Sequence, residues 1–82
     1  MIQKGINMYR ELDLVVLKHD ADDYGLKAGD VGTIVHCYPD NEAFEVEFLT
    51  AEGKTIAVLT LTPEEIRTRA EREILHVREI SV

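Results

Sequence analysis

A segment in the middle of the chain alternates in polarity, and a short turn separates it from a second strand-like segment. In AFEVEFL, two glutamates are interleaved with Phe44, Val46 and Phe48. The turn AEGK, centred on Gly53, leads into the strand-like segment TIAVLTL. Because successive side chains of a β-strand point to opposite faces, the alternation predicts a hairpin with one buried and one solvated face.

Two further strands are expected before this hairpin. Residues 11–18 (ELDLVVLK) predict a first strand, and residues 30–38 (DVGTIVHCY) predict a second. Gly32 near the start of the second strand indicates a bulge or a close backbone approach. The turn PDNE follows, in which Asp40 or Asn41 tolerates a left-handed backbone.

The period changes after the hairpin, at TPEEIRTRAER. Thr62 is a good N-cap, Pro63 suits the first helical position, and Glu65 completes a capping box. These signals predict a short helix with Ile66 on its apolar face. The final alternating segment ILHVREI, residues 74–80, is expected to form the fifth strand.

These elements predict a mainly β fold, a small five-stranded SH3-like barrel with one short helix before the last strand. Closing a small sheet on itself pairs the strand edges around one core. Residues 1–82 are therefore expected to form a single domain, with residues 1–7 as a frayed amino-terminal extension.

Composition favours a cytoplasmic protein and disfavours nucleic acid as its partner. The single cysteine, Cys37, cannot form an internal disulfide, and no segment has the pattern of a secretion signal or a membrane span. The formal net charge of −7 repels phosphate backbones and anionic lipid surfaces. A basic partner suits this negative charge better than nucleic acid or an anionic membrane does.

The stretch HDADDYGLKAGDVGTIV resembles a metal or phosphate loop only superficially. Asp20, Asp22 and Gly25 fit the first half of a calcium loop, but Val31 stands where a bidentate glutamate is needed. The glycines are followed by a strand instead of a helix, so no helix amino terminus is available for phosphate. We therefore expect a turn-rich loop without calcium or nucleotide.

No other set of residues has the spacing of a metal or catalytic site. Neighbours on a strand face opposite ways, so His36 and Cys37 cannot readily share one metal, and Cys37 is expected to be a small core residue. Glu45 and Glu47 are explained by the solvated face of their strand. The sequence therefore predicts no enzyme activity, no cofactor and no metal.

A binding surface is the remaining candidate. Tyr9, Tyr24 and Tyr38 all lie at predicted strand ends or in loops, where a ring can be half exposed. The proposed binding residues combine an aromatic and an acidic rim that suits a basic or arginine-bearing protein segment. They are Tyr24, Asp20, Asp22, Asp23 and Tyr38.

The chain resembles a family of small bacterial proteins of uncharacterised function with an SH3-like barrel. Most of residues 10–80 take part in the likeness. It is carried by the string GLKAGDVGTIVHCYPDNEAFEVEF with GKTIAVLTL and ILHVREI, in particular by Gly25-Leu26, Gly29-Asp30-x-Gly32-Thr33, His36, Tyr38, Phe44–Phe48 and Ala57–Leu61. The resemblance implies the barrel fold but no reaction.

Several functions are compatible with these observations. The first is a non-enzymatic module that binds another protein, as an accessory, antitoxin-like or immunity-like partner of a basic protein. The alternatives are a homo-oligomeric structural unit such as a homodimer, an accessory subunit of an enzyme complex, and an RNA-binding KOW-like barrel. The acidic charge argues against the last of these.

Overall fold

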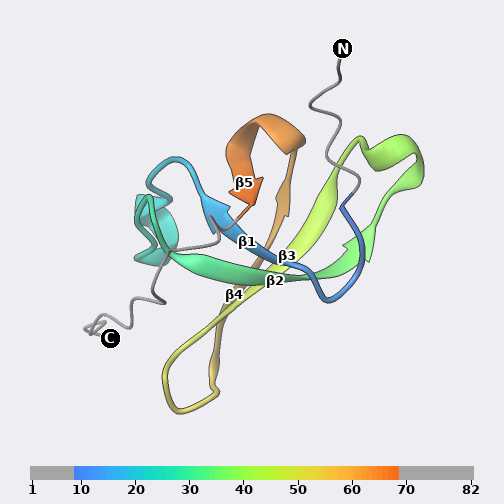
Figure 1. Ribbon diagram of the computed structural model, residues 1–82. Helices are drawn as coiled ribbons and strands as arrows, with labels where there is room; N and C mark the ends of the chain where they lie inside the picture. The colour runs from blue at the N-terminus through green and yellow to red at the C-terminus, as the bar shows by residue number, and fades with distance from the viewer. Residues whose placement is uncertain (1–8, 69–82) are drawn as a thin grey trace.

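A computed structural model describes residues 9–68, which form one antiparallel sheet of five strands (Figure 1). The strands lie in the order β4-β3-β2-β1-β5, so consecutive strands are neighbours up to β4 and β5 returns to lie beside β1. The helical elements of this region are three short 3-10 turns, η1 to η3. The element bounds are β1 Leu14–Leu17, η1 Asp22–Tyr24, β2 Val31–Cys37, η2 Pro39–Asn41, β3 Phe44–Leu49, β4 Thr55–Leu61, η3 Pro63–Glu65 and β5 Ile66–Thr68.

The predicted hairpin is confirmed as β3 and β4. Phe44, Val46 and Phe48 are fully buried, and the two glutamates between them face the other side of the sheet. Leu61, Leu59 and Ala57 pair with these three residues across the hairpin. Gly53 adopts φ 89° in the turn, a left-handed conformation that glycine reaches without a side-chain clash.

The core lies on the concave side of the sheet and receives side chains from all five strands. The buried hydrophobic cluster consists of Tyr9, Val15, Leu17, Leu26, Ile34, Phe44, Val46, Phe48, Leu59, Leu61 and Ile66. Two of its aromatic rings are in contact, since the ring of Tyr9 meets that of Phe44 edge to face with centroids 5.2 Å apart. The expectation of a half-exposed Tyr9 is therefore wrong.

The segment before β1 is held to the core by contacts that have no sequence motif. The amide of Tyr9 donates a hydrogen bond to Oδ1 of Asn41 at 3.0 Å. Asp40 and Asn41 have φ values of 61° and 54°, so both residues of the PDNE turn are left-handed, where one was expected to be. This turn presents the Asn41 amide group to the incoming chain.

Gly32 of β2 lies against side chains of β3 with no room for a side chain of its own. A Cβ atom at this position would lie 2.6 Å from Cγ1 of Val46 and 2.8 Å from Cε1 of Phe48. The close approach predicted for Gly32 is thus confirmed. The bulge of β2 lies further along the strand, where the register with β3 shifts between Ile34 and His36.

The short helix predicted after Thr62 is wrong within the described residues. The capping box of Thr62 and Glu65 is present, but it closes the single turn η3. The chain then extends at once into β5, and Ile66 is buried as a strand residue instead of a helix residue. The β-branched Ile66 and the Lys18–Glu65 backbone bond of 3.0 Å favour pairing with β1 over another helical turn. The strand predicted over residues 74–80 lies outside the described residues.

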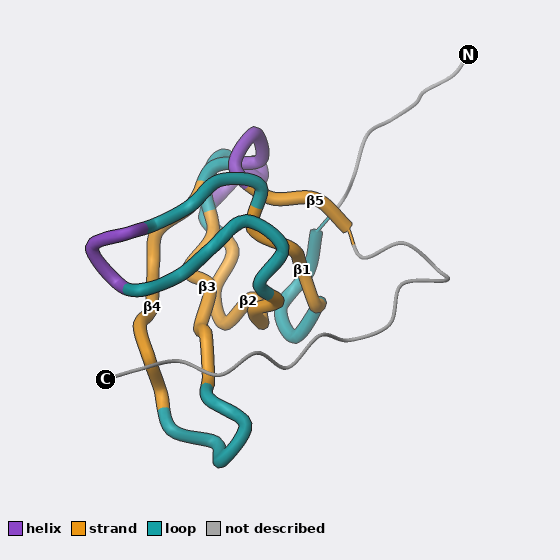
Figure 2. The backbone as a smooth tube through the Cα atoms, turned by 90° about the vertical axis from the view of Figure 1, so that its left-hand side faces the viewer, coloured by secondary structure: helices purple, strands orange, loops and turns teal. Residues whose placement is uncertain are grey.

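The sheet is strongly curled but open (Figure 2). β4 and β5 lie at opposite ends of the strand order, yet the four-residue connection 62–65 joins them. A flat sheet of five strands would separate its outer strands by about 19 Å, more than a compact 3-10 turn of about 2 Å per residue spans. The sheet must therefore bend. Within residues 9–68, β4 and β5 do not pair, so the predicted barrel closure is absent from this region.

Candidate functional site

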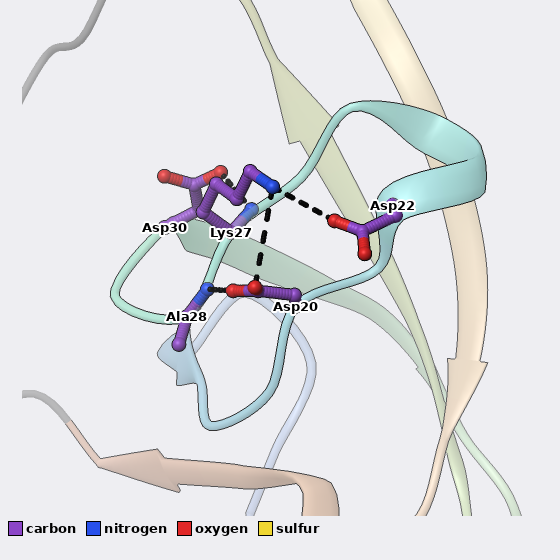
Figure 3. Close-up of polar contacts among 5 residues, drawn as sticks. All are labelled: Asp20, Asp22, Lys27, Ala28 and Asp30. Carbon is purple, nitrogen blue, oxygen red and sulfur yellow. Dashed lines mark hydrogen bonds and ion pairs between the residues drawn. The ribbon is translucent and has the colours of Figure 1, made fainter.

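The acidic loop between β1 and β2 uses its carboxylates to hold its own conformation (Figure 3). Oδ1 of Asp20 accepts a hydrogen bond from the amide of Ala28 at 2.9 Å, and Oδ2 of Asp30 accepts one from the amide of Lys27 at 2.9 Å. The ammonium group of Lys27 lies 2.8 Å from Oδ1 of Asp22 and 4.0 Å from Oδ2 of Asp20. The aspartates thus close a compact loop around one lysine.

These contacts explain why the loop is rich in aspartate without a metal ligand set. An ammonium group and two backbone amides satisfy the carboxylates that a calcium loop would direct at the ion. Among residues 9–68, no group of three or more His, Cys, Asp or Glu side chains is placed to hold a metal ion. Tyr24 remains exposed at the end of η1.

The structure does not bring Tyr24 and Tyr38 together. Tyr24 precedes β2 and Tyr38 follows it, and the seven residues of that strand extend about 20 Å. Figure 1 shows η1 in teal at one end of the sheet and η2 in light green at the other. The predicted aromatic pair therefore belongs to two separate surfaces.

Tyr38 instead borders the convex side of β2, β3 and β4. We call this surface the outer face; it consists of Thr33, Val35, His36, Tyr38, Glu45, Glu47, Val58 and Thr60. Cross-strand pairs fix its layout: Glu45 lies between His36 and Thr60, and Glu47 lies between Thr33 and Val58. Two carboxylates therefore occupy the middle strand, with polar and apolar side chains on either side.

The β2 bulge decides which residues reach the outer face. Ile34 is buried, so regular alternation would turn Val35 outward and His36 inward. The register shift inserts Val35 as an extra residue, and His36 then pairs with the outward-facing Glu45. Val35 is 41% exposed. Consecutive apolar and ring side chains thus lie on one surface, next to a glutamate.

The Glu45 carboxylate is held in place by two hydroxyl groups. Its Oε2 accepts a hydrogen bond from the Tyr38 hydroxyl at 2.6 Å and another from Oγ1 of Thr60 at 2.8 Å. These hydrogen bonds, that of Tyr38 first, lower the pKa of Glu45 and keep it ionised. The same bond to Glu45 raises the pKa of the Tyr38 phenol. The second oxygen, Oε1, has no hydrogen-bond donor among residues 9–68.

The His36 ring completes this cluster. It meets the ring of Tyr38 edge to face with centroids 4.8 Å apart, and its Nδ1 lies 3.9 Å from Oε2 of Glu11. Glu47, the next residue of β3 on this face, is also held by a hydroxyl group. Its Oε2 accepts a hydrogen bond from Thr55 Oγ1 at 2.7 Å. The outer face is therefore acidic, aromatic and organised by internal hydrogen bonds.

Cys37 lies on the opposite side of the sheet from His36, as the sequence predicted. It pairs with Phe44, packs against the core, and its Sγ lies 3.7 Å from the carbonyl oxygen of Tyr9. Burial, then the carboxylates of Glu11 and Asp13, raise the pKa of the Cys37 thiol. A protonated thiol is a poor nucleophile, so this position suits a packing role.

The sequence pointed to Tyr38, but it predicted only a solvated strand face for Glu45 and Glu47 and no site for His36. Their assembly depends on strand register and on a one-residue bulge, which no local motif encodes. The alternation of AFEVEFL did place both glutamates on one face. The hydroxyl groups that bind them were not predicted: Tyr38 and Thr60 donate to Glu45, and Thr55 donates to Glu47.

Comparison with known proteins identifies the family of this chain. No curated protein and no solved structure matches the sequence. Among the residues that the structure describes, no helix has the length and apolar character needed to cross a bilayer. A family model described as a domain of unknown function, DUF4926, matches residues 11–68, which include all five strands. The chain belongs to the DUF4926 family.

Proposed function

We propose that this domain is a non-enzymatic protein-binding module whose outer face accepts a basic segment of another protein. The observation that carries the proposal is the Glu45 carboxylate, which two hydroxyl donors hold ionised and in a fixed position. An oriented carboxylate next to the Tyr38 ring suits an arginine guanidinium, which pairs with carboxylates and stacks on aromatic rings.

The surroundings of Glu45 support a protein ligand over a small cation. Val35, Tyr38 and Val58 are exposed around the two glutamates, so a partner would bury apolar area as well as pair charges. The outer face contains no lysine or arginine of its own. The chain charge of −7 adds long-range attraction for a basic partner.

The test compares the affinity of two synthetic peptides for the full chain by calorimetry. One peptide alternates arginine with valine, and the other has glutamate in place of arginine. We expect only the arginine peptide to bind, more weakly as salt rises. The E45Q/E47Q double variant should weaken binding by about three- to tenfold, as expected for two exposed ion pairs.

The matched control is D23N, which removes one exposed charge from the loop between β1 and β2. It should leave the affinity within about twofold of the unmodified chain. If D23N weakens binding as much as the double variant does, general charge or the loop is responsible instead of the outer face. No binding of the arginine peptide at low salt would refute the proposed function.

A further inference from the structure

β4 is an edge strand with little of the usual protection against pairing. Within residues 9–68 it pairs with β3 on one side and with no strand on the other. Natural edge strands are commonly shortened, interrupted by lysine, proline or inward-pointing charge, or twisted away by a bulge. Of these devices β4 has the bulge, because its register with β3 shifts between Phe48 and Leu49 and leaves Ile56 as an extra residue. β4 has seven residues, and its sequence TIAVLTL contains no charge, no proline and no glycine.

The exposure of β4 shows where the edge is open. Leu59 and Leu61, near the η3 turn, are largely covered at 9% and 6% exposure. Ile56 and Ala57 pack only partly against the core, and Val58 is 49% exposed. In Figure 1 this part of the β3–β4 hairpin extends beyond the rest of the sheet. An added strand could therefore pair along Thr55–Leu59.

We propose that the basic partner segment binds as an additional strand on this edge of β4; the inference rests on the proposed function. An extended segment there would donate and accept backbone hydrogen bonds with β4. Its inward side chains would cover Ile56 and Ala57, and its outward side chains would lie beside Val58 and Thr60. The ligand pattern is therefore apolar residues alternating with arginine or lysine.

The outer face provides the charge that selects this pattern. Outward residues of the added strand lie two strands from Glu45 and Glu47, about 10 Å between backbones. An arginine and a glutamate side chain together bridge that distance. The edge thus supplies main-chain hydrogen bonds for any extended segment, while the two carboxylates select a basic one.

Charge also decides between this partner and a second copy of the chain. Pairing two β4 edges would place two chains of charge −7 side by side, with their outer-face glutamates on either side of the junction. Like charges in this arrangement repel. A basic segment has no such penalty, so it is the ligand that fits this edge.

The test measures amide hydrogen exchange of the full chain by NMR, free and saturated with the arginine–valine peptide. Exchange of the edge-facing amides between Thr55 and Leu59 should slow by about tenfold or more when the peptide binds. The glutamate–valine peptide is the matched control and should leave exchange unchanged. Amides of the β1–β2 loop should not respond to either peptide.

The outcomes separate this inference from the proposed function. If the peptide binds with the predicted loss in E45Q/E47Q but β4 exchange is unchanged, strand addition is wrong and binding to the outer face stands. Slow exchange in the free monomer would mean that another segment of the chain covers the edge, which overturns the inference. Protection of the β4 amides that grows with protein concentration would show that a second copy of the chain pairs with this edge, and this would also overturn the inference.

Discussion

Two hydroxyl groups from different parts of the chain orient the Glu45 carboxylate and lower its pKa. The Tyr38 hydroxyl and the Thr60 hydroxyl both donate to Oε2, so a single carboxylate oxygen carries two short hydrogen bonds. This pair stabilises the ionised form and fixes the direction of the other oxygen. A glutamate on a plain solvated strand would have neither property.

Replacing Tyr38 with phenylalanine should raise the pKa of Glu45 toward its ordinary value, because the largest cause of the lowered pKa is lost. A lowered carboxyl pKa contributes stability above the unfolded-state pKa, and this is lost as the pH falls through the folded-state pKa. In Y38F, the free energy of unfolding should therefore rise less as the pH increases from the folded-state pKa of Glu45 to its unfolded-state pKa. Carbon-detected NMR titration of the carboxyl group measures the change, and an unaltered Glu45 pKa would contradict the assignment.

Gly32 gives a second prediction at this scale. The Cβ of G32A would collide with Val46 and Phe48, at 2.6 Å and 2.8 Å, so overpacking should lower the unfolding free energy by about 1–3 kcal/mol. Urea denaturation measures this loss. Adding V46A makes room, and the double variant should lose less than the sum of the two single losses. If the losses of the two single variants simply add in the double variant, the contact of residue 32 with Val46 is not the cause of the destabilisation by G32A.

At the scale of elements, the described fold was predictable wherever pattern and turn chemistry agree. The β3–β4 hairpin follows from its alternation and the Gly53 turn, and Gly32 marked the close approach of β2. The predicted capping box of Thr62 and Glu65 is also present, but a capping box can begin either a helix or a single turn. Ile66 extends because pairing with β1 outweighs local helix preference, a tertiary effect that sequence alone does not encode.

The η3 turn makes a direct prediction about stability. Glu65 Oε1 accepts a hydrogen bond from the Thr62 amide at 2.8 Å, and this turn links the two outer strands of the sheet. E65A should lower the unfolding free energy by about 1 kcal/mol, as loss of a capping interaction does. The neighbouring E64A should change it by less than about 0.5 kcal/mol. Equal effects in urea titrations would remove the special role of Glu65.

The site was harder to predict than the strands because it depends on register. A one-residue bulge after Ile34 brings Val35 and His36 onto one surface, and the hairpin register puts Thr60 beside Glu45. Tyr9 was assigned to the surface, yet packing against Phe44 buries it. The acidic loop has the composition of a ligand site, but the carboxylates of Asp20, Asp22 and Asp30 bind groups within the loop itself.

The whole molecule combines a curled open sheet with an acidic, aromatic outer face. The short 62–65 connection bends the sheet, which turns the core residues inward and the β2–β4 polar cluster outward. The chain charge of −7 then favours basic ligands before any contact is made. The central claim is that a basic segment binds at this face and not at the acidic loop.

An NMR titration of the isotope-labelled full chain with the arginine–valine peptide tests this claim most directly. Binding at the outer face should change the amide shifts of His36, Glu45 and Val58 most, and these changes should saturate together. Changes confined to Asp22–Tyr24, at the far end of β2, would contradict it.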